Sequence, residues 1–212
     1  MTGADPDWPY ILTGYFCFSL SKIMAAFSSM VMIPSFSGFF VWSYAHIYDM
    51  PTDEFRRVID VNVSGAFLGI KHVSKYMIEH GINGKITLIS SNSAWMPYPV
   101  FGGYPHYAAS KGGVNSLAIE AAKELKRYGI MVNVVAPGGM VTAGASGNMC
   151  AKELPEEKQD EFYEELMVWQ TDGTQPVDMV AIVAYAMSTP MSDGMTGEIV
   201  VAGWWNVPQY RQ

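Results

Sequence analysis

The segment HYAASKGGVNSLAIEAAKELKRYGIMVNVVAPGG, residues 106–139, decides how this chain folds. Its first part is typical of a long helix, and Gly129 supplies a residue at which such a helix ends. The apolar run that follows is typical of a buried strand, and it breaks at Pro137 and Gly138. A helix that leads directly into a buried strand indicates a unit of a parallel sheet covered by helices.

The alternation of helix and strand continues on both sides of this segment. Residues 51–81 are typical of a long helix that Thr52 or Asp53 can cap and that Gly81 ends. The run KITLISS, residues 85–91, is typical of a short buried strand. Further along, we expect two helices and a last strand, in residues 154–170, 175–188 and 197–203.

Composition narrows the class of protein. The 212 residues suffice for one domain with a sizeable core. The net charge is −7 and the sequence has no long basic run, which argues against a nucleic-acid-binding surface. Cys17 and Cys150 are the only cysteines, so we expect no disulfide framework and a cytoplasmic protein. The four histidines lack metal-ligand spacing, and we predict no metal site.

Residues 1–48 form an atypical apolar segment that differs from the domain expected over residues 49–212. The 23 residues from Ile23 to Ala45 carry no formal charge and are long enough to span a bilayer. Five serines and Pro34 weaken a membrane interpretation, and the acidic start MTGADPD is unlike a signal peptide. We therefore expect a buried part of a soluble or oligomeric fold, with a membrane tether as the alternative.

Several residues suited to chemistry follow the predicted strands. In open parallel sheets, ligands bind beyond the carboxyl ends of the strands. Ser91 ends one predicted strand, Pro137 ends the next, and Tyr107 and Lys111 lie one turn apart at the start of the helix between them. A phenol beside an ammonium is either an acid/base couple or ordinary surface chemistry. The placement of all these groups at one edge of the sheet favours a catalytic site.

Residues 49–202 resemble the short-chain dehydrogenase/reductase family. The matching segments are DVNVSGAFLG, GKITLISS, YAASKGGV, GIMVNVVAPGGMVT and MTGEIVV, in the family's order. The resemblance implies an α/β fold with a Rossmann-like, doubly wound parallel sheet covered by helices. It also implies an NAD(P)-dependent oxidoreductase, forming a homodimer or homotetramer, that interconverts a secondary alcohol and a ketone. Hydroxysteroids, sugars, polyols and other hydrophobic carbonyl compounds are the substrate classes that it suggests.

The resemblance also implies catalytic roles for individual residues. Tyr107 is expected to be the general acid/base, with Lys111 lowering its pKa and binding the nicotinamide ribose. Ser91 is expected to orient the substrate oxygen, and Ser93 is its rival because Ser91 precedes Tyr107 by a slightly long gap. Asn62 is expected to hold a water that connects Lys111 to solvent, with a solvent-facing or core-capping asparagine as the alternative.

The expected cofactor and substrate contacts come from two further segments. In PGGMVT, residues 137–142, Pro137 and Gly138 would shape a turn, while the Met140 backbone and the Thr142 hydroxyl would hold the nicotinamide carboxamide. The substrate pocket is expected to be apolar. Its expected lining consists of Ser93, Trp95, Met96, Tyr98, Phe101, Tyr104, Met140 and Met149.

One part of the family's pattern is missing from the sequence. No strand, glycine-rich turn and helix is recognisable before residue 49, so the first βαβ unit is expected to be incomplete or replaced. Residues 39–43 are the candidate for a remaining strand there. The sequence does not distinguish NAD from NADP as the cofactor. A non-catalytic binding or interaction protein that has lost the dinucleotide site is therefore the alternative function.

Overall fold

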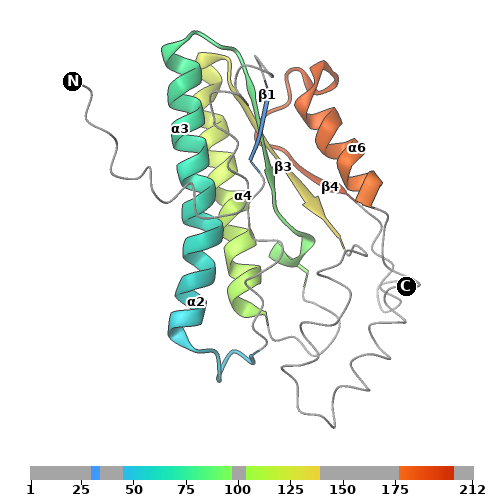
Figure 1. Ribbon diagram of the computed structural model, residues 1–212. Helices are drawn as coiled ribbons and strands as arrows, with labels where there is room; N and C mark the ends of the chain where they lie inside the picture. The colour runs from blue at the N-terminus through green and yellow to red at the C-terminus, as the bar shows by residue number, and fades with distance from the viewer. Residues whose placement is uncertain (1–29, 34–44, 97–103, 139–176, 203–212) are drawn as a thin grey trace, which may run out of the picture.

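The computed structural model describes residues 30–33, 45–96, 104–138 and 177–202. The described strands form one sheet in the order β1-β2-β3-β4, and each neighbouring pair is parallel (Figure 1). This confirms the parallel sheet that the sequence predicts. The strands are β1 (Met30–Ile33), β2 (Lys85–Ile89), β3 (Met131–Pro137) and β4 (Ile199–Ala202).

Helices cover both faces of this sheet, as the sequence predicts. Figure 1 shows α3 and α4 side by side on one face and α6 on the other. The helices are α2 (Thr52–Ile59), α3 (Gly65–Glu79), α4 (Pro105–Leu125) and α6 (Val177–Ser188), with a π-helical segment at Asp60–Ser64 and 3₁₀ turns at Asn92–Ala94, Lys126–Tyr128 and Pro190–Ser192.

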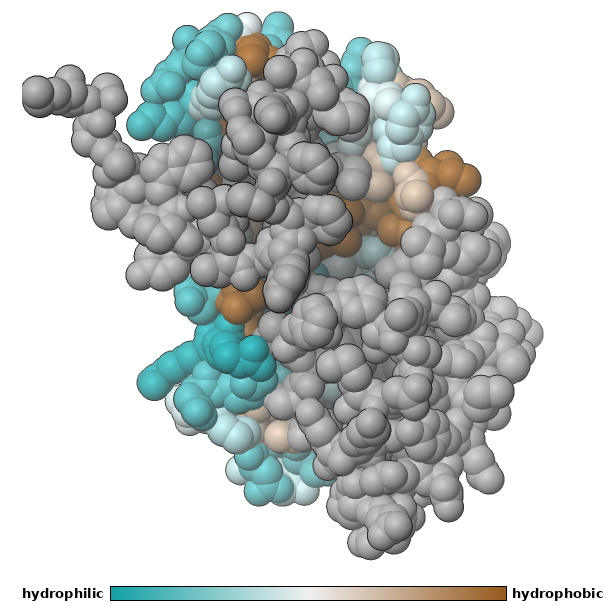
Figure 2. Space-filling view, in the orientation of Figure 1, coloured by the Kyte–Doolittle hydropathy of each residue, from teal (hydrophilic) through white to brown (hydrophobic). Residues whose placement is uncertain are grey.

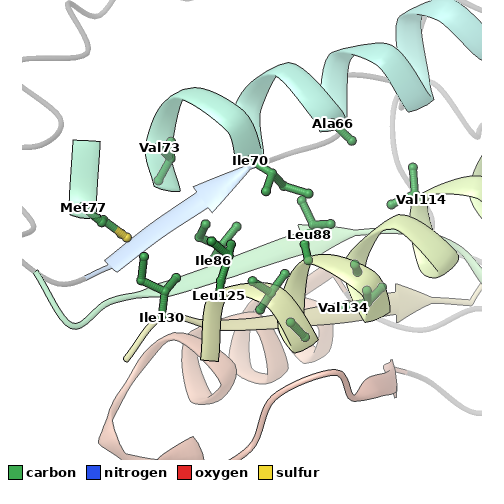
Figure 3. Close-up of a cluster of buried hydrophobic side chains, with 14 residues drawn as sticks. Ala66, Ile70, Val73, Met77, Ile86, Leu88, Val114, Leu125, Ile130 and Val134 are labelled. Carbon is green, nitrogen blue, oxygen red and sulfur yellow. The ribbon is translucent and has the colours of Figure 1, made fainter. Parts of the chain in front are cut away.

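The larger hydrophobic core lies between the sheet and the helices α3 and α4 (Figure 3). Ile86 and Leu88 of β2 and Val132 and Val134 of β3 contribute alternate side chains, all fully buried. Each such side chain contributes about 1.5–3 kcal/mol relative to an exposed one. The helices supply Ala66, Ile70, Val73 and Met77 from α3 and Val114, Ala118, Ala121, Ala122 and Leu125 from α4.

A smaller core covers the other face of the sheet, under α6. Val180, Ala184 and Met187 recur at helical spacing and pack with Val135 of β3 and Ala202 of β4. The exposed side of this helix is also apolar, and Figure 2 shows hydrophobic surface there in contrast to the hydrophilic surface around α2.

The polar side chains at the start of β2 hold the sheet to the segment that follows α6. Lys85 Nζ donates to Ser192 Oγ at 3.0 Å and pairs with Asp193 Oδ1 at 2.7 Å. Thr87 Oγ1 lies 3.1 Å from Ser188 Oγ. These contacts satisfy the buried polar groups at the amino-terminal ends of the strands. The candidate site residues predicted from the sequence lie at the opposite edge of the sheet, where the strands end.

The helix predicted over residues 51–81 forms, but its start differs from the prediction. The N-cap is Pro51, in extended conformation, and no side chain caps the helix there. The prediction that Thr52 or Asp53 caps the helix is wrong because Thr52 is already its first helical residue. Asp53 and Glu54 instead lie in the first turn, where a negative charge is favourable toward the helix dipole.

Glycines end both long helices as predicted. Gly81 and Gly129 adopt positive φ angles of 62° and 71°. After Gly81, the amide of Ile82 donates to the carbonyl of Met77 at 2.8 Å. After Gly129, the amide of Ile130 donates to the carbonyl of Leu125 at 3.3 Å. These are Schellman motifs, which satisfy carbonyls at the end of the helix and turn the chain back into the sheet.

The apolar N-terminal stretch contributes a strand to the sheet. Met30 pairs with Lys85 and Ile33 with Leu88, so β1 lies parallel to β2. The stretch predicted as a possible membrane segment thus contains four residues of the sheet. No helix in the described ranges is both long and apolar enough to cross a bilayer. The candidate strand at residues 39–43 and the helix expected at 154–170 lie outside the described residues.

We expect Gly129→Ala to destabilise the protein more than Gly81→Ala. Both replacements place a side chain at positive φ, which costs about 1–2 kcal/mol. An added Cβ at Gly129 would also lie 2.4 Å from Asn83 Oδ1, whereas nothing lies within 4 Å at Gly81. Urea unfolding of both variants measures the difference. In an Asn83→Ala background, the cost of Gly129→Ala should fall to that of Gly81→Ala, and an unchanged cost would contradict the steric explanation.

Candidate active site

The candidate site lies where β2 and β3 end and α4 begins. Beyond β2, the amide of Ser90 donates to the carbonyl of Val135 at 2.8 Å, which keeps the two strands together to their ends. The hydroxyl of Ser90 donates to the backbone carbonyl of Lys111 at 3.2 Å. These two hydrogen bonds fix the first turns of α4 against the carboxyl end of β2.

Tyr107 and Lys111 lie one turn apart on α4, as their spacing predicts. Lys111 Nζ is 5.4 Å from the centre of the Tyr107 ring. The lysine is only 2% exposed, and its Nζ donates to the carbonyl of Ile89 at 3.3 Å. The ammonium is therefore held between the end of β2 and the phenol, out of reach of bulk water.

Ser91 is the serine that interacts with Tyr107. It caps the short 3₁₀ turn after β2, where its hydroxyl accepts a hydrogen bond from the Ser93 amide at 3.1 Å. The Ser91 side chain also hydrogen-bonds the phenol of Tyr107. Ser93 is next to it, with 3.1 Å between the two hydroxyl oxygens. This geometry favours Ser91 over Ser93 as the group that meets a substrate oxygen beside Tyr107.

The ionisation of the tyrosine differs from the sequence-based expectation. Burial raises the pKa of Tyr107, while the hydrogen bond from Ser91 lowers the pKa by a smaller amount. Burial also lowers the pKa of Lys111 from 10.5 to about 7. The expectation that Lys111 brings the pKa of Tyr107 below its usual range is wrong because both charged forms lose their hydration. Tyr107 thus keeps its proton at neutral pH.

Asn62 is fully buried in the π-helical segment, which excludes the solvent-facing alternative. Its Nδ2 donates to Ser110 Oγ at 2.7 Å. Its Oδ1 is buried and has no hydrogen-bond partner among the described residues. The structure therefore brings Asn62, Ser91, Tyr107 and Lys111 to one place. A water held by Asn62 stays a prediction.

Of the other predicted site residues, some lie within the described ranges and some lie outside them. Pro137 is buried at the end of β3, and the Gly138 amide donates to the carbonyl of Ala202 at 3.1 Å. Tyr104 is buried directly before α4, whereas Trp95 is 47% exposed and only partly available to line a pocket. Predicted cofactor and pocket residues outside the described ranges are Tyr98, Phe101, Met140, Thr142 and Met149.

Two fully buried residues beside Tyr107 were missed by the sequence analysis, His106 and Ser110. Burial lowers the pKa of His106, the charge of Glu54 raises it, and the charge of Arg57 lowers it. Glu54 and Arg57 form a two-pronged ion pair on α2, with both N–O distances at 2.7 Å. The position of Ser110 between Tyr107 and Lys111 was a usable signal, but nothing in the sequence marked His106 as buried.

The chemistry that this arrangement offers is transfer of a proton at a fixed oxygen. The phenol interacts with the Ser91 side chain, and the Lys111 ammonium lies 5.4 Å from the centre of the phenol ring. Among the described residues, no three His, Cys, Asp or Glu side chains gather as a metal site requires. The side chains of Tyr107, Lys111 and Ser91 can donate hydrogen bonds and exchange protons, but none of them can accept a hydride.

The buried Lys111 makes protein stability depend on pH. Its folded pKa of about 7 lies below the unfolded value of 10.5, so the unfolded chain binds more protons between these two pH values. Wild-type stability should therefore rise with pH in this window, by up to about 1.4 kcal/mol per pH unit. We expect Lys111→Met to be most stabilising relative to wild type at pH 6–7, and its advantage to disappear toward pH 10.5.

Urea unfolding at several pH values, with Lys123→Met as control, measures this dependence. Lys123 is exposed on the same helix, and its replacement should change stability by a small amount that does not vary over the same range. A Lys111→Met effect that is equal at pH 6 and pH 10 would contradict the assignment of a desolvated ammonium.

Comparisons with known proteins identify the family of this chain. Residues 41–153 match the family model for short chain dehydrogenase. The chain is 38% identical over 95 residues to glucose 1-dehydrogenase 2 of Bacillus subtilis (strain 168), covering 45% of this chain and 36% of that protein. It is 38% identical over 118 residues to (+)-borneol dehydrogenase 2 of Salvia officinalis, covering 55% and 40%. The matches thus span well under half of these curated relatives.

Solved structures show the same fold. A crystal structure of NAD⁺-bound xylitol dehydrogenase superposes with a TM-score of 0.70 at 22% identity, covering 87% of this chain and 72% of that one. A 3-oxoacyl-[acyl-carrier protein] reductase with bound NAD from Brucella melitensis superposes with a TM-score of 0.59 at 28% identity, covering 77% and 57%. Because the family model also matches more than half of the chain, this protein belongs to the short-chain dehydrogenase family.

Proposed function

We propose that the protein is an NAD(P)-dependent oxidoreductase that interconverts a secondary alcohol and a ketone. The observation that carries this proposal is the meeting of Ser91, Tyr107 and Lys111 at the end of β2, with the phenol hydrogen-bonded to the serine. Relatives named as glucose and borneol dehydrogenases support an alcohol or sugar as the substrate. The proposed substrate class comprises sugars, polyols, hydroxysteroids and other hydrophobic carbonyl compounds.

In this proposal the protein's own residues handle the proton and the orientation of the substrate. Tyr107 is protonated at neutral pH and can give its proton to a carbonyl oxygen as that oxygen gains negative charge. Ser91 donates to the same oxygen and fixes its position. Lys111 lies 5.4 Å from the ring of Tyr107 and has a pKa of about 7, so it can exchange a proton in the neutral range.

Four of the residues proposed for the nicotinamide side of the cofactor, Tyr107, Lys111, Pro137 and Gly138, lie among the described residues. NAD or NADP would supply the hydride chemistry that no side chain here provides. As the resemblance implies, Lys111 would contact its ribose, Pro137 and Gly138 would shape the turn, and the Met140 backbone and Thr142 hydroxyl would hold the carboxamide. Gly138 is already fixed in place by its hydrogen bond to Ala202.

A non-catalytic binding protein is the second candidate function, and one observation favours it. Dinucleotide sites of this fold place a glycine-rich turn between the first strand and its helix. In this chain the glycines before residue 49, Gly3, Gly14 and Gly38, are isolated and form no such turn in the sequence. Cofactor binding therefore distinguishes the two functions.

We also propose a cytoplasmic homodimer or homotetramer whose contacts include the outer faces of α3 and α4. Phe67 and Tyr76 on α3 and Ile119 on α4 are 48%, 39% and 46% exposed. Large exposed apolar side chains on neighbouring helices suit a subunit interface.

Titration of the protein with NADH and NADPH tests the proposed cofactor. We expect saturable enhancement of nicotinamide fluorescence with at least one of them. The nucleotide that binds more tightly is the preferred cofactor. The absence of binding at millimolar concentrations of both would favour the non-catalytic function.

Tyr107→Phe tests the proton donor. The phenyl ring keeps the packing but cannot donate, so we expect turnover to fall about 10²–10⁴-fold while cofactor binding is retained. Tyr128→Phe is the matched control, because Tyr128 is exposed directly after α4, and it should keep wild-type turnover. Near-normal turnover by Tyr107→Phe would show that another group provides the proton.

A further inference from the structure

A buried chain of hydrogen bonds links the π-helical segment to the backbone of Tyr107. Asn62 Nδ2 donates to Ser110 Oγ at 2.7 Å, and Ser110 Oγ donates to the carbonyl of Tyr107, also at 2.7 Å. The first distance lies at the short end of the range for N–H···O bonds, and the second is ordinary for an O–H···O bond. Asn62 and Ser110 are both wholly buried, so water does not compete for these contacts.

The residues joined by these hydrogen bonds come from distant parts of the sequence. Asn62 lies in the π-helical segment Asp60–Ser64, and Ser110 lies 48 residues later in the second turn of α4. A π-helical turn contains an extra residue and is frequent at functional sites. Here it occurs where Asn62 turns fully inward while its neighbour Val61 is 37% exposed. The break in helical regularity thus coincides with the residue that reaches α4.

Close packing of the two backbones makes the contact possible. A Cβ added at Gly113, one turn beyond Ser110, would lie 3.0 Å from Val63 Cγ2. The side of α4 that faces the π-helical segment therefore carries a glycine where a larger residue would push the helices apart. This separation sets the distance at which the Asn62 amide meets the Ser110 hydroxyl.

We propose that Ser110 is a positioning residue for Tyr107, acting through the backbone and held in place by Asn62. The Tyr107 carbonyl accepts the Ser110 hydroxyl in addition to the helix ladder bond expected from the Lys111 amide. Fixing this carbonyl fixes the first turn of α4, and with it the phenol beside Ser91. Asn62 thereby helps to position Tyr107, because its side-chain amide holds the Ser110 hydroxyl. The catalytic part of this inference rests on the proposed function.

Ser74 provides a matched control for an ordinary structural serine. It is buried on α3, and its hydroxyl donates to the carbonyl three residues earlier, Lys71, at 3.3 Å. Serines in helices often make this local bond without any effect on a site. Ser110 makes the same local bond but also accepts the Asn62 amide and lies between Tyr107 and Lys111.

The test compares Ser110→Ala, Ser110→Thr, Asn62→Ala and Ser74→Ala. For Ser110→Ala and Asn62→Ala we expect kcat to fall about 10- to 100-fold, with KM for the nicotinamide cofactor within about twofold of wild type. Ser110→Thr keeps the hydroxyl that bonds back along the helix and should restore most of kcat. Ser74→Ala should leave kcat unchanged. Equal losses of kcat in Ser110→Ala and Ser74→Ala would overturn the proposal.

A second readout does not depend on turnover. The Tyr107 phenol is titrated by difference ultraviolet absorbance, with Tyr107→Phe subtracted in each background. Loosening the first turn weakens the hydrogen bond from Ser91 that favours the phenolate, so Ser110→Ala and Asn62→Ala should move the titration to higher pH. Ser74→Ala should not move it. An unmoved titration in Ser110→Ala and Asn62→Ala would overturn the positioning role.

The two proposals can fail separately. If wild type binds neither NADH nor NADPH and shows no turnover, the proposed function fails, and the phenol titration still decides whether Ser110 positions Tyr107. If wild type turns over and the titration is unmoved in both variants, the function stands and the positioning role fails.

Discussion

The hydrogen bond from Lys111 Nζ to the carbonyl of Ile89 joins the sheet to the helix that carries the candidate site. Together with the hydrogen bond from the Ser90 hydroxyl to the Lys111 carbonyl, it holds the start of α4 against the end of β2, where Tyr107 and Ser91 meet. The hydrophobic core between β2, β3 and α4 supports this contact from below, since its side chains allow α4 only one position on the sheet. The chemistry of the site thus depends on an ammonium buried at the edge of an apolar core.

The strands β2, β3 and β4 were predictable because each is a short apolar run with a glycine, proline or polar residue at its end. The helix ends at Gly81 and Gly129 were predictable because positive φ strongly favours glycine. The strand β1 was not, because the uncharged stretch from Ile23 to Ala45 has no clear period or break that selects four residues. Only pairing with β2 makes that choice.

The site was predictable where its members are fixed by chain position alone. Tyr107 and Lys111 share a helix face, and Ser91 directly follows a strand, so the sequence pattern places all three at one edge of the sheet. The role of Ser110 depends on its contact with Asn62 in the π-helical segment, 48 residues earlier, which local patterns do not reveal. The direction of the Tyr107 pKa shift depends on burial, which local patterns do not reveal either.

The two buried lysines at opposite ends of β2 lie in different surroundings. Lys85 pairs with the Asp193 carboxylate at 2.7 Å and donates to Ser192, so its charge is compensated within the fold. Lys111 donates to a neutral carbonyl, and burial brings its pKa to about 7. Holding that charge at neutral pH therefore costs stability that an apolar side chain would not. A residue that weakens the fold yet lies against the candidate proton donor is suited to moving a proton.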